Sequence, residues 1–123
     1  MILVIGEILF DIFPDSKRFG GAPFNFAFHL KQLGFPVRFI TRVGDDRNGA
    51  RIIQMLTAHD FDGDDVQVDR SRPTGTVRVD LDEKGVPRLR STLATSVEHL
   101  SLLRHQPVGT THGSPYHYDR WVP

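Results

Sequence analysis

The stretch that most constrains the fold runs from residue 19 to residue 49, FGGAPFNFAFHLKQLGFPVRFITRVGDDRNG. Gly20 and Gly21 allow a positive φ or a close backbone approach to a ligand, both of which a Cβ would hinder. Pro23 favours the first turn of a helix, because its missing N–H would have no partner there. Gly34 favours the end of that helix. The stretch therefore predicts a helix that starts at a glycine turn.

This predicted helix carries apolar residues over a wide surface. Phe26, Leu30 and Leu33 recur at positions i, i+4 and i+7, and Ala27 and Phe28 add to the apolar surface. We therefore expect the helix to be packed on most of its sides.

Two short segments flank the helix and predict parallel strands. Residues 1–6, MILVIG, form a continuous apolar run that is typical of a strand buried on both faces. Residues 37–41, VRFIT, are β-branched and aromatic and follow a proline. A strand, a helix and a strand in this order predict a right-handed βαβ unit.

A second helix is predicted to follow Asp46, whose carboxylate can cap it. Its narrow apolar stripe consists of Ile52, Ile53 and Leu56. Gly44 and Gly49 are interpreted as structural, because no G-x-x-x-x-G-K-[ST] spacing is present. Asp45 and Asp46 are interpreted as turn and cap residues, with metal binding by the pair as the alternative.

The segment after Arg72 predicts a sheet of a different kind. Before this segment, a short strand is predicted at Val66–Val68. From residue 77 onward, Val77, Val79 and Leu81 alternate with polar residues. This alternation is typical of a half-buried antiparallel strand. Residues 82–85, DEKG, supply a turn that would return it as a hairpin.

Four residues in the N-terminal quarter of the chain are candidates for ligand contacts. Asp11 interrupts an apolar segment, so its carboxylate either faces a cleft or is a solvated strand-end or capping group. Gly20 and Gly21 form either a ligand-facing turn or simply a tight strand-to-helix turn. Asn25 can bridge ligand hydroxyl groups, or it can satisfy backbone groups at the helix start.

The segments GGAPFNFAFHLKQLG and RVGDDRNG resemble the first signature of the ribokinase-like (pfkB-type) carbohydrate kinases, with fructokinase-like members nearest. The pattern combines paired glycines, an asparagine five residues after the first, a glycine that ends the helix, and a distal G-D-D-x-x-G. The resemblance covers about the first 87 residues. It implies an α/β fold: a partial, truncated, doubly wound sheet with a small antiparallel β lid, for which the strand near residue 77 is a candidate.

The resemblance also implies a function and a set of site residues. Such kinases use ATP and Mg²⁺ to phosphorylate a sugar hydroxyl, and in them the residues matching Asp11 and Asn25 bind sugar hydroxyls while those matching Gly20 and Gly21 bring backbone against the sugar. Fructose, ribose, ketodeoxygluconate and a nucleoside all remain open as substrates. A nucleotide-binding Rossmann module is disfavoured, because no G-x-G-x-x-G follows the first strand.

The catalytic aspartate and the anion hole of the family come from a G-A-G-D motif, and this sequence contains none. We therefore assign no catalytic and no metal-binding residue, and expect no ATP-binding residues and no kinase activity in this chain alone. The alternative function is that of a non-catalytic fragment with weak sugar binding or an association role.

Composition limits the partners. Fifteen basic and fifteen acidic residues give a formal net charge of zero, which predicts no attraction to nucleic acid or to a membrane surface. The absence of cysteine fits a reducing compartment, and the N-terminal run lacks the basic residues of a signal peptide, so we expect a cytoplasmic protein. Family members are longer, which predicts an open sheet edge and an uncovered apolar face, and homo-oligomers could form through that edge or the lid.

The sequence changes character after Pro87. Residues 88–123 hold 2 of the 15 acidic residues and four of the six histidines. We expect residues 1–87 to be the kinase-like portion and residues 88–123 to be a poorly ordered tail outside the family, produced by a frame change or a misjoined gene end. One helix is predicted at Ser96–Arg104. A metal site formed by His112, His117 and Asp119 is disfavoured, because their spacing is irregular.

Overall fold

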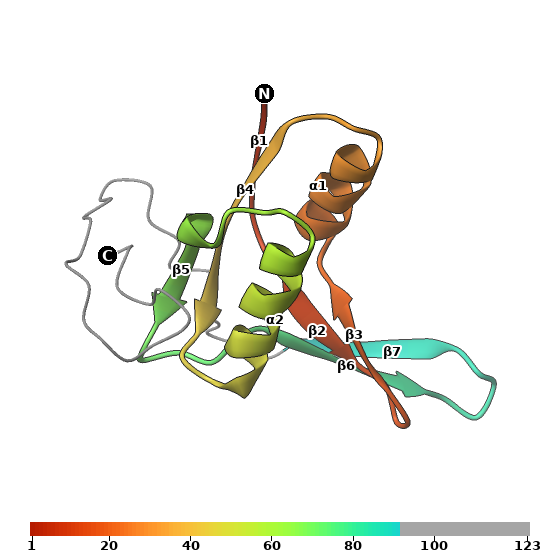
Figure 1. Cartoon of the computed structure of the whole chain (residues 1–123). Coiled ribbons are helices and arrows are strands. Elements are labelled where there is room, and N and C mark those ends of the chain that lie inside the picture. Colours follow the sequence, from red (N-terminus) through yellow and green to blue (C-terminus); the bar gives the residue numbers. More distant parts are fainter. Residues whose placement is uncertain (92–123) are drawn as a thin grey trace.

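The computed structural model describes residues 1–91 of the 123-residue chain. This part forms two sheets and two α-helices (Figure 1). In chain order the elements are β1 (Ile2–Ile5), β2 (Leu9–Ile12), β3 (Lys17–Gly20), α1 (Ala22–Gln32), β4 (Val37–Gly44), α2 (Arg47–Ala58), the short 3₁₀ helix η1 (Gly63–Asp65), β5 (Val66–Asp69), β6 (Thr76–Leu81) and β7 (Pro87–Ser91).

The first sheet has the strand order β1-β4-β5, and both of its strand pairs are parallel. Val4 lies opposite Phe39, and Val43 lies opposite Val68. The strands predicted near the N-terminus, at 37–41 and at 66–68 are therefore confirmed, and β4 continues to Gly44. These strands and both helices contribute to one apolar core.

The N-terminal strand is not buried on both faces, as its continuous apolar sequence predicted. Val4 belongs to the core that contains both helices, whereas Leu3 and Ile5 are 53% and 41% exposed. Successive side chains of a strand point to opposite faces, so Leu3 and Ile5 lie on the face opposite the helix-covered one. In the part of the chain that the structure describes, the expected uncovered apolar surface is thus present at β1.

Helix α1 begins at the glycine turn as predicted, but it is not packed on most sides. Phe24 and Ala27 are buried in the core. Phe26 and Leu33 are 58% and 74% exposed. The apolar pattern was correct for the helix period, yet Phe26 and Leu33 lie on a part of the helix surface that the described residues leave exposed.

Helix α2 agrees with its predicted cap and apolar stripe. Ile52, Ile53 and Leu56 are all buried in the core. The Asp46 side chain accepts a hydrogen bond from the Gly49 N–H at 2.8 Å. This bond satisfies one of the backbone donors that every helix start leaves without an intrahelical partner.

The second sheet has the order β3-β2-β6-β7 and extends to one side of the first sheet in Figure 1. We call it the lid sheet. Strands β2 and β3 form an antiparallel hairpin, as do β6 and β7, while β2 and β6 pair in parallel at its centre. The strand and hairpin predicted from residue 77 are confirmed. The β2–β3 hairpin was not predicted as part of this sheet, and its pairing with the predicted antiparallel hairpin is parallel.

Strand β6 has a partner strand that begins at Pro87 and continues into the segment expected to be a poorly ordered tail. Residues Pro87–Ser91 form β7, in which Leu89 lies opposite Val79. The boundary predicted after residue 87 therefore falls at the start of a lid strand. The predicted helix at Ser96–Arg104 and the site at His112, His117 and Asp119 lie outside the described residues. Within residues 1–91, none of the helices has the length and apolar character needed to cross a membrane.

Candidate sugar-binding site

The Asp11 carboxylate lies against Gly20. Asp11 sits in β2, and Gly20 ends the neighbouring strand β3. A Cβ at Gly20 would overlap the carboxylate of Asp11, with its carbon only 2.9 Å away. Glycine is thus required at this position by the close approach of an acidic side chain. The structure brings together two residues that are nine positions apart and that the sequence marked separately.

Gly21 turns the chain from β3 into α1. Its φ of 107° lies in a region that L side chains rarely adopt, and a Cβ there would lie 2.8 Å from the Glu7 carbonyl oxygen. Gly21 is also the N-cap of α1 and provides no side-chain cap. The Asn25 N–H donates to the Gly21 carbonyl at 2.9 Å. Gly21 is therefore needed for the strand-to-helix turn itself, which is one of the two roles that the sequence left open for it.

The side chains of Asp11 and Asn25 are both available to a ligand. Asn25 is exposed and Asp11 is half-buried. Within the described residues neither side chain has a hydrogen-bonding partner. A carboxylate supplies acceptors and an amide supplies both donors and acceptors, which is the set that hydroxyl groups need. Their roles as sugar ligands remain predictions.

Side chains of β2 and β3 in the lid sheet contact the N-terminal part of α2. Lys17 in β3 donates to the Asn48 side chain, and its Nζ lies 4.4 Å from the centre of the Phe10 ring. Arg51 lies 5.4 Å from the same ring. Partial desolvation and then repulsion by Arg51 lower the pKa of Lys17. This contact was not predictable from the sequence, because no local pattern pairs a hairpin with a later helix.

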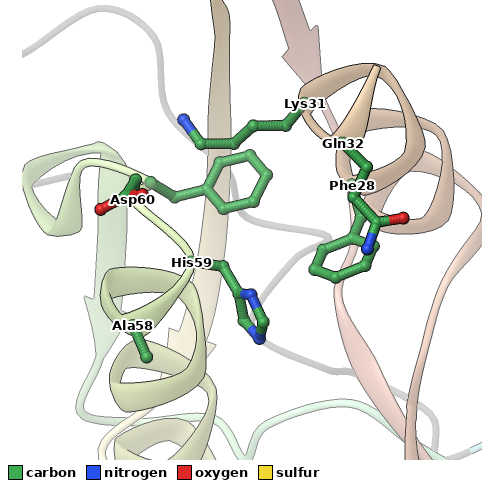
Figure 2. A pocket seen from close by; sticks show the side chains of 7 residues that line it. Phe28, Lys31, Gln32, Ala58, His59 and Asp60 are labelled. Carbon is green, nitrogen blue, oxygen red and sulfur yellow. The ribbon is translucent and has the colours of Figure 1, made fainter. Parts of the chain in front are cut away.

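A separate hollow of about 210 Å³ lies at the other end of the two helices (Figure 2). Its lining residues are Phe28, Lys31, Gln32, Ala58, His59, Asp60 and Phe61. The Phe28 and His59 rings meet edge to face at 5.0 Å, and Lys31 Nζ lies 4.7 Å from the Phe61 ring centre. None of the predicted sugar ligands lines this hollow, since Asn25 lies at the opposite end of α1. Among residues 1–91, no three acidic or histidine side chains gather into a metal-binding group.

A comparison with known protein families shows to which family the chain belongs. The model of the pfkB family of carbohydrate kinases matches residues 4–103. The chain belongs to this family. The match continues past residue 87, where the family resemblance was expected to end.

The relatives are sugar kinases of greater length. An Escherichia coli fructokinase is 36% identical over 89 residues, which cover 68% of this chain and 29% of the relative. A Pyrococcus horikoshii sugar kinase, solved in complex with ATP, has a TM-score of 0.71 and 28% identity over 79% of this chain and 35% of that one. A Vibrio cholerae fructokinase solved with fructose, ADP and calcium has a TM-score of 0.65 and 31% identity, over 78% of this chain and 33% of that one.

These comparisons confirm the partial ribokinase-like fold. The chain spans about 29% of the length of the E. coli relative, so the match covers a minor part of the known enzymes.

Proposed function

We propose that this chain forms the sugar-binding part of a fructokinase-like pfkB kinase. Asp11 and Asn25 hold sugar hydroxyl groups, and Gly20 and Gly21 let the sugar approach the backbone. The observation that carries the proposal is the accessible Asp11 carboxylate seated on Gly20, immediately before a helix that presents Asn25. The fructose named in the V. cholerae complex supports this choice of ligand.

The complete reaction would transfer the terminal phosphoryl group of ATP to a sugar hydroxyl. That step requires a base for the hydroxyl proton and positive or N–H groups that neutralise the moving phosphoryl group. No G-A-G-D motif supplies these groups in this sequence. ATP and Mg²⁺ are therefore proposed for the reaction, but no residue of this chain is assigned to hold them, and the chain alone is expected to be inactive. Such a chain would act in the cytoplasm.

Sugar binding is tested by NMR titration of the 123-residue chain with fructose and, in parallel, ribose. We expect shifts at the amides of Gly20, Gly21 and Asn25. Asp11→Asn replaces one acceptor oxygen by an NH2 donor, and Asn25→Ala removes the amide. Each should weaken binding about tenfold, because a sugar hydroxyl loses the acceptor or donor that it requires. The control is Asp15→Asn, which removes a carboxylate from the exposed β2–β3 turn. Equal affinity in all three variants would place the site elsewhere.

Activity is a separate measurement. ATP-dependent phosphorylation of fructose by the purified chain, lost in Asp11→Asn, would contradict the expected inactivity. No ADP release above the sugar-free background is the expected result.

An association role is the second candidate, supported by the exposed side chains of β1. Within residues 1–91 this strand lies at one edge of the first sheet, and Leu3 and Ile5 are both exposed. Exposed apolar strand edges favour pairing with another chain. Sedimentation should then show homo-oligomers that Ile5→Lys disrupts and that Leu33→Lys, on α1, leaves intact. A monomer at all concentrations would exclude this role.

A further inference from the structure

The Asp46 carboxylate binds more than the start of α2. Its Oδ1 accepts from the Gly49 N–H at 2.8 Å and from the Thr74 hydroxyl at 2.7 Å. Its Oδ2 accepts from the Thr74 N–H at 2.9 Å. A simple N-cap needs only the first of these three bonds. The other two join α2 to a residue 28 positions further along the chain.

Thr74 is buried and all of its polar atoms near this site are paired. The side chain is 2% exposed, and its hydroxyl also accepts from the Gly44 N–H at 2.9 Å. The chain packs so closely here that a Cβ at Gly44 would lie 2.5 Å from the Thr74 nitrogen. A Cβ at Gly49 would overlap the Gly44 carbonyl oxygen and lie 3.1 Å from the Thr74 hydroxyl. Both glycines of the G-D-D-x-x-G segment are therefore required by this contact.

Thr74 lies directly before the lid. The carbonyl of the next residue, Gly75, accepts from the Phe10 N–H at 3.1 Å. Strand β6 then runs beside β2, with Val77 opposite Asp11. The anchored segment thus leads without interruption to the strand that carries the candidate sugar carboxylate.

The lid is also tied to α2 from its other side. Strand β3 flanks β2 opposite β6, and its Lys17 donates to Asn48 in the first turn of α2. The two strands on either side of β2 are therefore both fixed to the start of the same helix. These contacts connect the strands on both sides of Asp11 to the start of α2.

We propose that Asp46 and Thr74 form a clasp that holds the lid sheet in register with the helix layer and so sets the position of Asp11. Asp46 is a positioning residue in this proposal, and its second carboxylate oxygen is the group that distinguishes this role from capping. The importance of the clasp for sugar binding rests on the proposed function, whereas its effect on the lid does not.

Amide hydrogen exchange of the full chain, followed residue by residue by NMR, tests the clasp. Thr74→Val removes the hydroxyl, and with it the bonds to Asp46 Oδ1 and from the Gly44 N–H. It leaves the Gly49–Asp46 cap and the backbone bond from the Thr74 N–H to Asp46 in place. We expect amides of β2 and β6 to exchange about tenfold faster, while Ile53 and Leu56 in α2 remain close to wild type. Thr74→Ser keeps the hydroxyl and should restore wild-type exchange in the lid. Equal acceleration of the lid and α2, or none in the lid, would overturn the proposal.

A second pair of variants decides the matter if Thr74→Val does not fold. Asp46→Asn leaves one acceptor oxygen for three donors but retains a good N-cap residue. Asp45→Asn removes the same charge from the adjacent exposed residue. Faster lid exchange in Asp46→Asn alone supports the clasp, and identical behaviour of the two variants overturns it.

The link to the site has its own readout. The carboxyl carbon shift of Asp11 and the amide shift of Gly20 should both change in Asp46→Asn and remain unchanged in Asp45→Asn. Unchanged shifts in both variants would show that the clasp does not position Asp11. If the wild-type chain binds neither fructose nor ribose, the proposed function fails while the exchange result still decides the clasp.

Discussion

Arg42 and Asp69 form a buried ion pair in which Arg42 Nε lies 3.3 Å from Asp69 Oδ2 and each side chain is 3% exposed. The pair joins neighbouring parallel strands, since Arg42 lies in β4 and Asp69 ends β5. The other carboxylate oxygen accepts from the N–H groups of Ser71 and Arg72 at 2.8 and 3.1 Å. Asp69 therefore fixes both the sheet and the turn that leaves it.

This arrangement predicts an acid-dependent stability. Burial raises the pKa of Asp69, but the Ser71 N–H and the Arg42 and Arg72 guanidinium groups outweigh it, so the net pKa is lowered. A lowered pKa in the folded state means that the stabilisation is complete above the unfolded pKa of about 4 and is lost as pH falls further. Asp69→Asn should cost about 3 kcal/mol at pH 7 and less at about pH 3.

Urea unfolding of wild type and Asp69→Asn at both pH values measures this effect. Asp15→Asn, in an exposed turn, should differ little from wild type at either pH. The same cost of Asp69→Asn at both pH values would contradict the ion-pair explanation.

We expect a substitution at Asp60 to stabilise the folded state. Asp60 follows the C-cap of α2 with a φ of 62°, a left-handed conformation that favours glycine. A negative charge is also unfavourable at a helix C-terminus. Asp60→Gly should therefore raise the unfolding free energy by about 1 kcal/mol, as measured by thermal denaturation. Asp60→Ala removes the charge but keeps the Cβ, so a gain as large as that of Asp60→Gly would assign the effect to charge alone.

We also expect a substitution at Thr41 to stabilise the folded state. The Thr41 Oγ1 is buried and has no hydrogen-bond partner among residues 1–91. Valine has nearly the same shape without the hydroxyl, so Thr41→Val should stabilise the fold by about 1 kcal/mol. Thr57→Val provides the contrast, because the Thr57 hydroxyl donates to the Ile53 and Gln54 carbonyls on the surface of α2. Chemical denaturation that ranks Thr41→Val below wild type would indicate that the hydroxyl is paired in solution.

We expect the substitution Gly20→Ala to weaken sugar binding through a packing clash. The methyl group of Gly20→Ala would collide with the Asp11 carboxylate and displace it. Fructose binding should fall about tenfold or more, although the substitution removes no protein atom that is proposed to hydrogen-bond to the sugar. Gly63→Ala, whose Cβ would meet only the Thr57 methyl group at 3.2 Å, is the matched control. Retained binding in Gly20→Ala, with circular dichroism like that of wild type, would argue against Asp11 as a sugar ligand.

Local chemistry made several features predictable. The α2 stripe of Ile52, Ile53 and Leu56 follows the helix period, and the Asp46 cap needs only the next three residues. The alternation around Val79 specifies a strand in the same local way. Helix start, helix period and strand alternation are properties of neighbouring residues, so the sequence by itself determined them, along with the family pattern of paired glycines and asparagine.

Only the tertiary structure decided which apolar faces are covered and which distant residues meet. Leu3 and Phe26 resemble core residues in sequence, yet both are exposed, because burial depends on what packs against a face and not on the residue alone. The parallel pairing of β2 with β6, the seating of Asp11 on Gly20 and the bonds from Asp46 to Thr74 all join segments whose separation carries no periodic signal. Such contacts form only when folding brings these distant segments together.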